Sequence, residues 1–294
     1  MYMRRTWVLV LALAIVGAAG AFAQAFTVSY LDGTVELQTA KGWSAVSIGD
    51  QVAADATVRI SQQGSLELSR AKTKITLLKD GVFSIASLAK ASSSAGAGVG
   101  GSISQKLQTL VTEKPKASTA GGVRGAEQGS ANVTWVDEGD ETRSQAQSLI
   151  DAKKYQDAAA MLSDAIKNAG PDTDTSELGY LLGVAYYGAG QTAKAYRALG
   201  QVNADPGTTW YARYVILRAQ VLVDTQNYND ALTLLGPFTT TYPTGEATQV
   251  AWLLSGISQR ALGNAAAAKT DFDTGYQLDP STDTARLIDQ QRHL

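Results

Sequence analysis

The fold of the C-terminal half is decided by four related segments: KYQDAAAMLSDAI (154–166), QTAKAYRALGQV (191–202), NYNDALTLLGPF (227–238) and NAAAAKTDFDTGY (264–276). When they are aligned, one column contains only alanine, at Ala158, Ala195, Ala231 and Ala268. The separations in this column are 37, 36 and 37 residues. A period of this length is typical of helix pairs that stack side by side. We therefore predict about four helix pairs in this half of the chain.

A second column supports this interpretation. It lies in the helix expected before each segment and contains small residues with the same separations of 37, 36 and 37 residues: Ala146, Gly183, Ala219 and Gly256. Small side chains are needed where paired helices cross closely, because a bulky side chain would force the backbones apart. Larger residues follow each second-helix alanine by four positions and are expected to fill the space between helices. These are Leu162, Leu199, Leu235 and Phe272.

The ends of the helix pairs are predicted from proline and from capping residues. We expect the second helices to be stopped by the prolines that follow them, because proline lacks a backbone donor. These prolines are Pro171, Pro206, Pro243 and Pro280. After Pro280, Ser281 or Thr282 is expected to cap a polar amphipathic helix that closes the stack. The single histidine, His293, lies in this last segment and is interpreted as a surface residue.

This pattern resembles the tetratricopeptide repeat family over residues 141–280, with a period slightly longer than the usual one of about 34 residues. The stretch YPTGEATQVAWLLSG (242–256) in particular resembles the repeats of bacterial envelope proteins. The resemblance implies an all-α superhelix in which the first helix of each pair lines a concave surface that binds partner proteins. Chaperone-adaptor members hold a terminal carboxylate with a lysine and asparagine clamp. That clamp is not reproduced here, so this ligand is not implied.

Counting from the small first-helix residues predicts which side chains line the concave surface. Tyr and Arg are frequent anchors of interfaces, since each combines a large contact area with a hydrogen-bonding end. An alternative role for the tyrosines is packing between neighbouring helices. The predicted partner-binding residues are Tyr180, Val184, Tyr187, Arg213, Gln220, Leu253, Ile257 and Arg260.

The N-terminal half has a different periodicity. Between residues 26 and 88, apolar and polar residues alternate in short runs, as in Val35/Leu37, Leu66/Leu68, Ile75/Leu77 and Phe83/Ile85. Such alternation predicts strands with one buried face. Turn signals separate the runs at Asp32-Gly33, Lys41-Gly42, Gly49-Asp50, Gln63-Gly64 and Asp80-Gly81. We expect an all-β domain, either a sandwich or barrel-like, that contains no helix.

The order of these segments resembles the periplasmic FecR-like (ferric citrate regulator) domain family. The resemblance is carried by GWSAVSIGDQV (42–52), ATVRISQQGSLELS (56–69), KITLLKDGVFSI (74–85), GGVRGAEQG (121–129) and ANVTWVDEG (131–139). After Val123-Arg124-Gly125 the family usually continues with Thr and an aromatic residue, whereas Ala126 and Glu127 follow here. The resemblance implies a β domain of envelope proteins that contacts a ligand or a protein without catalysis.

The N-terminus predicts export. A basic start, MYMRR, precedes an apolar stretch that ends in the small-residue site Ala21-Phe22-Ala23, which is typical of a secretory signal peptide. An uncleaved anchor facing the periplasm is the alternative, since Trp7–Ala23 is just long enough to span a bilayer. We predict a signal peptide at 1–23, a FecR-like β-rich domain at 24–140 with a flexible Gly/Ser-rich insertion at 90–105, and a repeat domain at 141–294.

Composition argues against several function classes. Residues 24–140 contain 11 basic and 11 acidic residues, and residues 141–294 contain 12 and 16, so neither half has the basic character of a nucleic-acid-binding domain. The chain has no Cys, which rules out disulfides, lipid attachment and thiolate chemistry. The fragment DTDTSE (172–177) lacks the glycine and the distal acidic ligand of a calcium loop. We predict no cofactor and no metal.

These observations predict a non-enzymatic scaffold or adaptor in the periplasm that binds envelope proteins through its repeat groove. The β domain is expected to contact another partner, peptidoglycan or a carbohydrate. The alternative function is a ligand-sensing or transport-accessory protein in which the β domain is the sensor. An enzyme is not expected, since no GxSxG, HExxH or Walker-type segment is present. The membrane is a partner only if the signal segment remains uncleaved.

Overall fold

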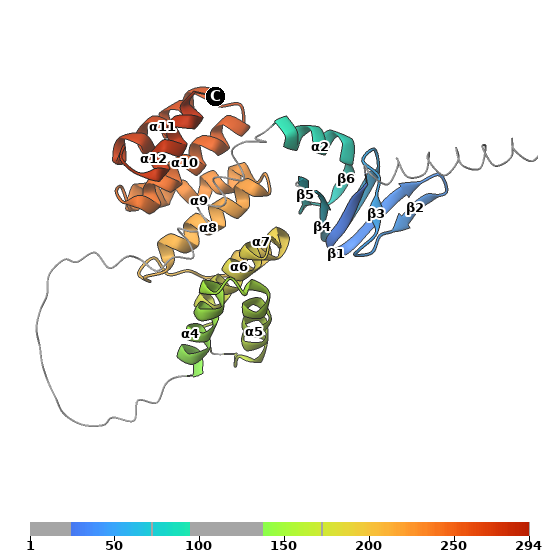
Figure 1. The fold of residues 1–294 in the computed structure, drawn as a ribbon, viewed down its shortest axis with the longest axis horizontal. Helices are drawn as coiled ribbons and strands as arrows, with labels where there is room; N and C mark the ends of the chain where they lie inside the picture. Colours follow the sequence, from blue (N-terminus) through green and yellow to red (C-terminus); the bar gives the residue numbers. More distant parts are fainter. Residues whose placement is uncertain (1–24, 72, 95–137, 172, 294) are drawn as a thin grey trace, which may run out of the picture. The chain divides into compact units, whose positions relative to one another are not determined.

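A computed structural model describes residues 25–71, 73–94, 138–171 and 173–293 (Figure 1). The chain divides into two compact units, Met1–Gly101 and Ser102–Leu294. The described part of the first unit is a strand-rich half-barrel, and that of the second is a series of repeated helices. Within these ranges no helix is long and apolar enough to cross a bilayer. The signal segment, the insertion from residue 95 onward and the Val123-Arg124-Gly125 element lie outside the described residues.

The half-barrel, as far as its residues are described, is one antiparallel sheet of six strands. Two strands of 14 residues each, β1 and β4, form its centre, and the sheet order is β2-β1-β4-β5. The short strand β3 pairs with β1, and β6 pairs with β4. The strands are β1 (Phe26–Thr39), β2 (Gly42–Ala45), β3 (Gln51–Val52), β4 (Thr57–Arg70), β5 (Thr73–Leu77) and β6 (Gly81–Ser84).

Both long strands bend at their middle, where two glycines meet. Asp32 pairs with Ser65, but the next pair is Thr34 with Ser61, so the register shifts at Gly33. Gly33 has φ +70, and a Cβ atom on it would lie 2.6 Å from the Cα atom of Gly64. The prediction that Asp32-Gly33 and Gln63-Gly64 are turns between strands is therefore wrong, because both dipeptides form an irregularity inside a strand. Such irregularities bend the strand and increase its twist.

The bend gives the half-barrel its core. One half of β1 and β4 pairs with β3 and β5, and the other half pairs with β2 and β6. Apolar residues from both halves meet in a single buried cluster, because the bend turns their inner faces toward each other. Its largest fully buried members in this unit are Phe26, Ile60, Leu66, Leu68 and Ile85.

A helix follows β6, the last strand among the described residues, contrary to the expectation of an all-β domain. The strand β6 ends at Ser84, and helix α2 (Ile85–Ser94) begins at Ile85, whose N–H donates to the carbonyl of Ala56 at 2.9 Å. The Phe83/Ile85 alternation is only one period long, and the Ala- and Leu-containing sequence that follows it favours a helix. The first five residues of the predicted flexible insertion, 90–94, belong to α2.

The described part of the helical unit contains four helix pairs and one final helix. The first helices of the pairs are α4 (Glu138–Asp151), α6 (Ser176–Gly188), α8 (Tyr211–Asp224) and α10 (Glu246–Ala261). Their second helices are α5 (Tyr155–Asn168), α7 (Thr192–Gly200), α9 (Tyr228–Thr241) and α11 (Ala265–Leu278). Successive first helices pack against each other, and each second helix packs mainly against first helices. The first helices therefore line the inner side of the stack.

The two helices of every pair are joined by the same three-residue turn. Its middle residue adopts a left-handed conformation in all four pairs, with φ of 58, 72, 60 and 84 at Lys153, Gly190, Gln226 and Gly263. The next residue donates its N–H to the carbonyl five positions earlier, as Lys154 does to Leu149 at 2.8 Å and Asn227 does to Leu222 at 2.8 Å. This is the Schellman arrangement, which satisfies the last carbonyls of the first helix.

The two columns of small residues lie at the helix crossings. All eight residues (Ala146, Ala158, Gly183, Ala195, Ala219, Ala231, Gly256 and Ala268) are buried. A Cβ atom on Gly183 would lie 2.4 Å from Leu199, and one on Gly256 would lie 2.4 Å from Phe272. The larger residue of each pair therefore fills the space that the small residue leaves.

The helix ends agree with only part of the proline pattern. Pro171, Pro243 and Pro280 lie within three residues of a helix end, but α7 already ends at Gly200, six residues before Pro206. The Tyr214 hydroxyl lies near the carbonyls of Leu199 (3.2 Å) and Val202 (3.4 Å), where α7 stops. Pro206 therefore does not terminate the second helix, and a side chain from α8 takes part in that end.

The final helix, α12 (Asp283–Arg292), packs against α10 and α11, where the first helix of a fifth pair would lie. Its cap is Thr282, whose hydroxyl accepts a hydrogen bond from the N–H of Ala285 at 2.9 Å. The Thr282 hydroxyl also lies 2.6 Å from Oε1 of Gln249 in α10. The same Gln249 donates to the carbonyls of Gly275 and Asp279, so one buried side chain connects α10, α11 and α12.

Candidate partner-binding face

The candidate site is the accessible side of the first helices α4, α6, α8 and α10, which we call the inner face. Polar side chains connect neighbouring first helices across it. Arg143 of α4 forms an ion pair with Glu177 of α6 at 3.0 Å, and the Tyr187 hydroxyl of α6 donates to Oδ2 of Asp224 in α8 at 2.8 Å. Polar contacts on the inner face therefore connect α4 to α6 and α6 to α8.

Four of the eight predicted partner-binding residues are buried and do not lie on this face. Tyr180, Val184, Gln220 and Leu253 have exposed fractions of 3%, 4%, 3% and 0%. The prediction fails for them because each first helix is packed against its own second helix and against neighbouring first helices. This packing buries much of α6, α8 and α10.

Tyr180 belongs to an aromatic cluster between the second and third pairs. Its ring stacks on Trp210 with a centroid distance of 5.5 Å and meets the Tyr214 ring edge-on at 6.5 Å. Burial raises the pKa of the Tyr180 hydroxyl to about 12, and the nearby Arg213 opposes this shift. For Tyr180 the alternative role, packing between helices, is the one that the structure supports.

Arg260 contacts the final helix. Its guanidinium donates to the carbonyl of Gln291 at 3.0 Å and to Oε1 of the same residue, and it lies 5.4 Å from the centre of the Phe272 ring. Burial lowers its pKa. Arg260 therefore attaches α12 to α10, and its predicted role as a partner contact is corrected to a role in closing the stack.

The remaining three predicted residues, Tyr187, Arg213 and Ile257, are partly exposed. They come from three successive first helices, α6, α8 and α10. A partner that lies along the inner face can therefore contact a phenol, a guanidinium and an aliphatic side chain in turn. Their contact with a partner remains a prediction.

Sequence reasoning missed two glutamine–aspartate pairs on the first helices. The side-chain amide of Gln147 donates to Oδ1 of Asp151 at 2.7 Å, and that of Gln220 donates to Oδ1 of Asp224 at 2.6 Å. Both pairs have the i, i+4 spacing that places two residues on one side of a helix. Both aspartates are exposed. The spacing is visible in the sequence and is the signal for these pairs.

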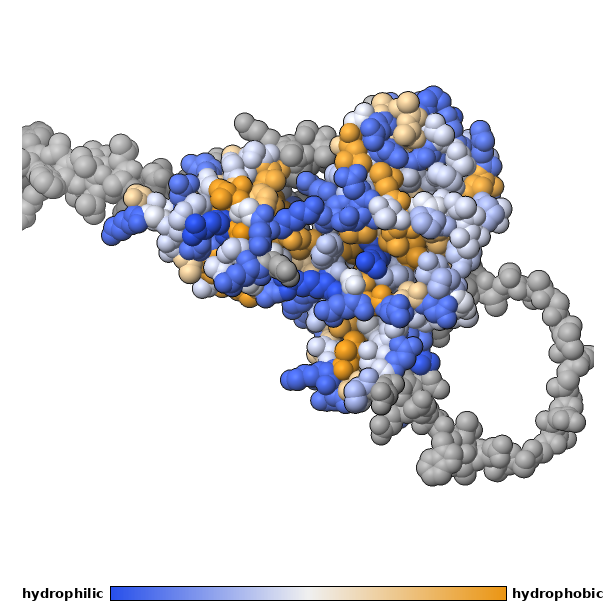
Figure 2. Space-filling view, turned by 180° about the vertical axis from the view of Figure 1, so that it is seen from behind, coloured by the Kyte–Doolittle hydropathy of each residue, from blue (hydrophilic) through white to orange (hydrophobic). Residues whose placement is uncertain are grey.

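Large exposed hydrophobic residues are scattered. In the described ranges they are Ile48 and Val82 in the strand unit and Leu262 in the turn between α10 and α11. In the view of Figure 2, hydrophobic residues form small groups among hydrophilic ones. Recognition on the inner face therefore has to rely on polar contacts as well as on apolar ones.

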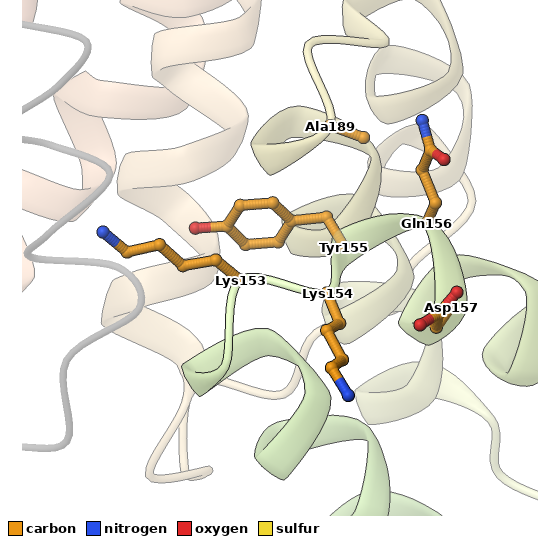
Figure 3. A pocket seen from close by; sticks show the side chains of 6 residues that line it. All are labelled: Lys153, Lys154, Tyr155, Gln156, Asp157 and Ala189. Carbon is orange, nitrogen blue, oxygen red and sulfur yellow. The ribbon is translucent and has the colours of Figure 1, made fainter.

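A shallow hollow of about 290 Å³ lies beside the turn between α4 and α5. Its lining residues are Lys153, Lys154, Tyr155, Gln156, Asp157 and Ala189. Figure 3 shows the two lysine side chains pointing away from each other, with Asp157 on the opposite side from Lys153. The charged groups do not converge on a common point, so we assign no ligand to this hollow.

The chain matches no family model and no curated protein. Two solved structures of MamA, "MamA AMB-1" and "MamA MSR-1", are similar to it at 21% identity and cover 52% of this chain. The matches span 89% and 84% of the MamA chains, with TM-scores of 0.41 and 0.39. The repeats of the present chain are established by its own period of 37, 36 and 37 residues and by its four equivalent turns.

Proposed function

We propose that this protein is an exported, non-enzymatic scaffold of the bacterial envelope that binds partner proteins along the inner face of its tetratricopeptide-like repeats. The observation that carries this proposal is the placement of Tyr187, Arg213 and Ile257 on three successive first helices, where each remains partly accessible. Tyr and Arg supply large contact area with hydrogen-bonding ends. An extended partner segment can reach them one after another.

Site-specific crosslinking tests this proposal. A photo-reactive amino acid is placed at Tyr187 or at Ile257, and a matched probe replaces Lys167, which is exposed on the second helix α5. After irradiation in the native envelope, we expect adducts with the same partner protein from positions 187 and 257 and none from position 167. Equal labelling from all three positions, or no adduct from either inner-face position, contradicts the proposal.

Export is supported by the basic, apolar and small-residue order of residues 1–23. We infer that the mature chain begins at Gln24 in the periplasm and that its strand unit is FecR-like. The N-terminal residue of the protein purified from a periplasmic fraction tests cleavage. A chain that still begins at Met1 and sediments with membranes contradicts it and favours the N-terminal anchor.

A second candidate function is ligand sensing by the strand unit. The observation that favours it is a partly exposed aromatic and cationic pair, in which the Arg59 guanidinium lies 4.5 Å from the centre of the Trp43 ring. Aromatic rings and guanidinium groups provide flat surfaces for stacking. A glycan or siderophore that raises the melting temperature of the native chain, but not of Trp43→Ala, supports this function. No shift with any such ligand contradicts it.

A further inference from the structure

Strand β2 lies at an edge of the half-barrel, where no described strand pairs with its outer side (Figure 1). Three of its four residues, Gly42, Ser44 and Ala45, are exposed, and Trp43 is partly exposed. Its pairing with β1 is regular over all four residues, without a bulge. A regular and exposed edge strand is a template for pairing with another strand.

The edge strands β3 and β5 are less suited to such pairing. The strand β3 has only two residues. The strand β5 carries Lys74, which forms an ion pair with Glu67 at 3.1 Å, and helix α2 packs against it. Charged residues and prolines are the devices that commonly protect an edge, and β2 contains neither. The edge strand β6 also lacks both, so it serves as the comparison in the experiments.

The backbone groups on the outer side of β2 are those of Trp43 and Ala45. The N–H of Val46 donates to the carbonyl of Val35 in β1 at 3.1 Å, so the N–H of Val46 points toward β1. Because these groups alternate in direction along a strand, Ser44 also faces β1, whereas Trp43 and Ala45 face outward. The N–H and carbonyl groups of these two residues are therefore available to an added strand.

These outward groups match those of a second β2 strand that runs antiparallel to the first. When the two-fold axis passes through Ser44, Trp43 of each copy lies opposite Ala45 of the other. Both residues then exchange N–H and carbonyl groups with their counterparts, so all the outward groups of the two strands are paired. A register centred on Trp43 or on Ala45 leaves part of them unpaired.

The side chains fit the same register. Trp43 and Ala45 lie on the outer face of the sheet, as Glu36 and Arg59 do. The Arg59 guanidinium lies 4.5 Å from the centre of the Trp43 ring and donates to Glu36 at 2.8 Å, which holds the ring in place. The antiparallel register places this large ring beside the small methyl group of Ala45 of the other copy. Such cross-strand contacts cover apolar surface on both copies.

Charges at the two ends of β2 select the antiparallel orientation of a second copy. Lys41 precedes the strand, and beyond its other end the Asp50 carboxylate accepts the N–H of Ser47 at 2.8 Å. Both charged residues are exposed, and neither forms an ion pair with a described residue. In the antiparallel pair, Lys41 of each copy comes opposite Ser47 of the other and therefore near its Asp50. A parallel pair would place the two Lys41 side chains together, where they repel.

We propose that β2 is a dimerisation edge, through which two copies of this chain join their half-barrels into one continuous sheet by antiparallel pairing centred on Ser44. The same surface is used on both copies, so the assembly closes at a dimer. Two short strands bury less than a standard interface of roughly 1,200–2,000 Å², so the dimer is weak and forms as the protein concentration rises. This inference does not depend on what the inner face binds.

Cysteine crosslinking of the full chain tests the register. The native chain has no Cys, so a single introduced cysteine reports only on contact between copies. In the proposed dimer the two Ser44 residues face each other with Cα atoms about 4.5 Å apart, which is within reach of a disulfide. We expect Ser44→Cys to form a covalent dimer at least about tenfold faster under mild oxidation than Ser84→Cys, an equally exposed position on β6. Equal rates, or faster crosslinking of Ser84→Cys, overturn the proposal.

Sedimentation equilibrium of the full chain up to millimolar concentration tests the edge itself. The Ala45 N–H points outward, so Ala45→Pro keeps the ladder with β1 and removes only a donor of the edge. We expect the native chain to dimerise and Ala45→Pro to raise the dissociation constant at least about tenfold. The control is Val82→Pro on β6, whose N–H also points outward, since the N–H of Ile85 donates to the carbonyl of Ala56 at 2.9 Å. This control should associate as the native chain does.

Three outcomes of this measurement contradict the proposal. They are a native chain that stays monomeric throughout, association that only Val82→Pro abolishes, and growth beyond a dimer, which indicates head-to-tail pairing of β2 with β6. The melting temperature of each variant verifies that the half-barrel is folded.

A charge reversal outside β2 tests the same contact without changing the strand. The native dimer should weaken as salt rises, because salt screens the attraction between Lys41 and Asp50 of the other copy. In Lys41→Glu the two charges repel, so the dimer should be weaker at low salt and should strengthen as salt rises. Lys79→Glu makes the same change of charge at an exposed position before β6 and should behave like the native chain. Equal effects of both reversals would assign the salt dependence to net charge and contradict the proposed contact.

Discussion

The half-barrel and the helical stack both bring backbones into close contact, but they do so in different ways. In the described part of the half-barrel, the close contact is made where Gly33 meets Gly64, in the middle of the two longest strands; we call this point the joint. The helical stack repeats its crossing in each pair, with Gly183 and Gly256 among the small residues there. Both central strands of the half-barrel, β1 and β4, pass through this joint, whereas each crossing of the stack serves one pair.

This difference predicts how each unit responds to damage. A sheet whose core is shared by both halves of its central strands should unfold as one body when the joint is disturbed. A repeat array is held by nearest-neighbour contacts, so a local change should affect the altered pair and its neighbours most. The following substitutions test this contrast, from the largest expected effect to the smallest.

The largest effect is expected from Gly33→Ala. The new Cβ atom would lie 2.6 Å from the Gly64 Cα atom, and the position has φ +70. Backbone strain and overpacking together should lower the free energy of unfolding of the half-barrel by about 3 kcal/mol or more. Hydrogen exchange should accelerate throughout β1, β4 and β5 and in α2, while the helices of the second unit keep their protection.

Gly42→Ala is the matched control for this joint. Gly42 also has a positive φ, +115, but no described atom lies within 4 Å of the point that its Cβ atom would occupy. The substitution should therefore add only backbone strain, which lowers the free energy of unfolding of the half-barrel by about 1 kcal/mol. If both substitutions cost the same, close approach at the joint is not what limits the half-barrel.

The next effect is an alkaline transition in the middle of the stack. The pKa of Tyr180 is raised from 10.0 to about 12, so the folded chain holds this proton more tightly than the unfolded chain does. The resulting stability is fully present below pH 10 and is lost as pH rises toward about 12. A shift of this size corresponds to roughly 3 kcal/mol.

Tyr180→Phe provides the comparison. Urea unfolding followed by helical circular dichroism should show a weaker loss of stability between pH 10 and about 12 in this variant than in the native chain. The aromatic contacts with Trp210 and Tyr214 are kept by phenylalanine, so the two proteins should be similar near neutral pH. An identical pH dependence in both proteins would show that Tyr180 does not contribute to the transition.

The contrast between the repeated crossings and the Gly33–Gly64 joint also explains which parts of the fold could be predicted from the sequence. The crossings were predicted because the pattern occurs four times, so Ala158 and its counterparts could be compared with each other. The joint was not predicted, because a dipeptide such as Asp32-Gly33 has the same composition in a turn and in a strand bend. What distinguishes them is the pairing of Asp32 with Ser65, a contact distant in sequence.

Counting along a single helix predicted the exposure of some candidate-site residues but not their surroundings. Tyr187 and Ile257 are partly exposed, as this counting implies, and their contact with a partner stays a prediction. Tyr180 is buried and Arg260 is bound by the final helix, because their surroundings come from elsewhere in the chain. Tyr180 is covered by Trp210 from the connection before α8, and Arg260 is bound by Gln291 of the final helix. Periodicity within a helix does not report what packs over it.

A smaller effect is expected at the helix crossings. Gly256→Ala should destabilise the fourth pair by about 1–3 kcal/mol, because the new Cβ atom would lie 2.4 Å from the Phe272 ring. The first and third pairs combine alanine with leucine at the same two positions. The double variant Gly256→Ala, Phe272→Leu should therefore recover part of the loss, with a coupling of about 1 kcal/mol. Strictly additive losses would contradict direct contact at the crossing.

The smallest effect is expected in the turns, where the repeats can be compared most closely. Gln226 adopts φ 60, a conformation that costs a residue with a side chain about 1–2 kcal/mol more than it costs glycine. Gln226→Gly removes this strain but adds entropy to the unfolded chain, so the net gain in stability should be about 0.5–1 kcal/mol. The reverse change in the next turn, Gly263→Ala, should lose a similar amount, since Gly263 has φ 84 and a Cβ atom there would meet no described atom within 4 Å. Thermal unfolding of Gln226→Gly and of Gly263→Ala, each compared with the native chain, measures both changes in stability. Shifts of opposite sign show that the left-handed position is equivalent in the two turns, whereas shifts of the same sign would mean that the turns differ despite their common hydrogen bonds.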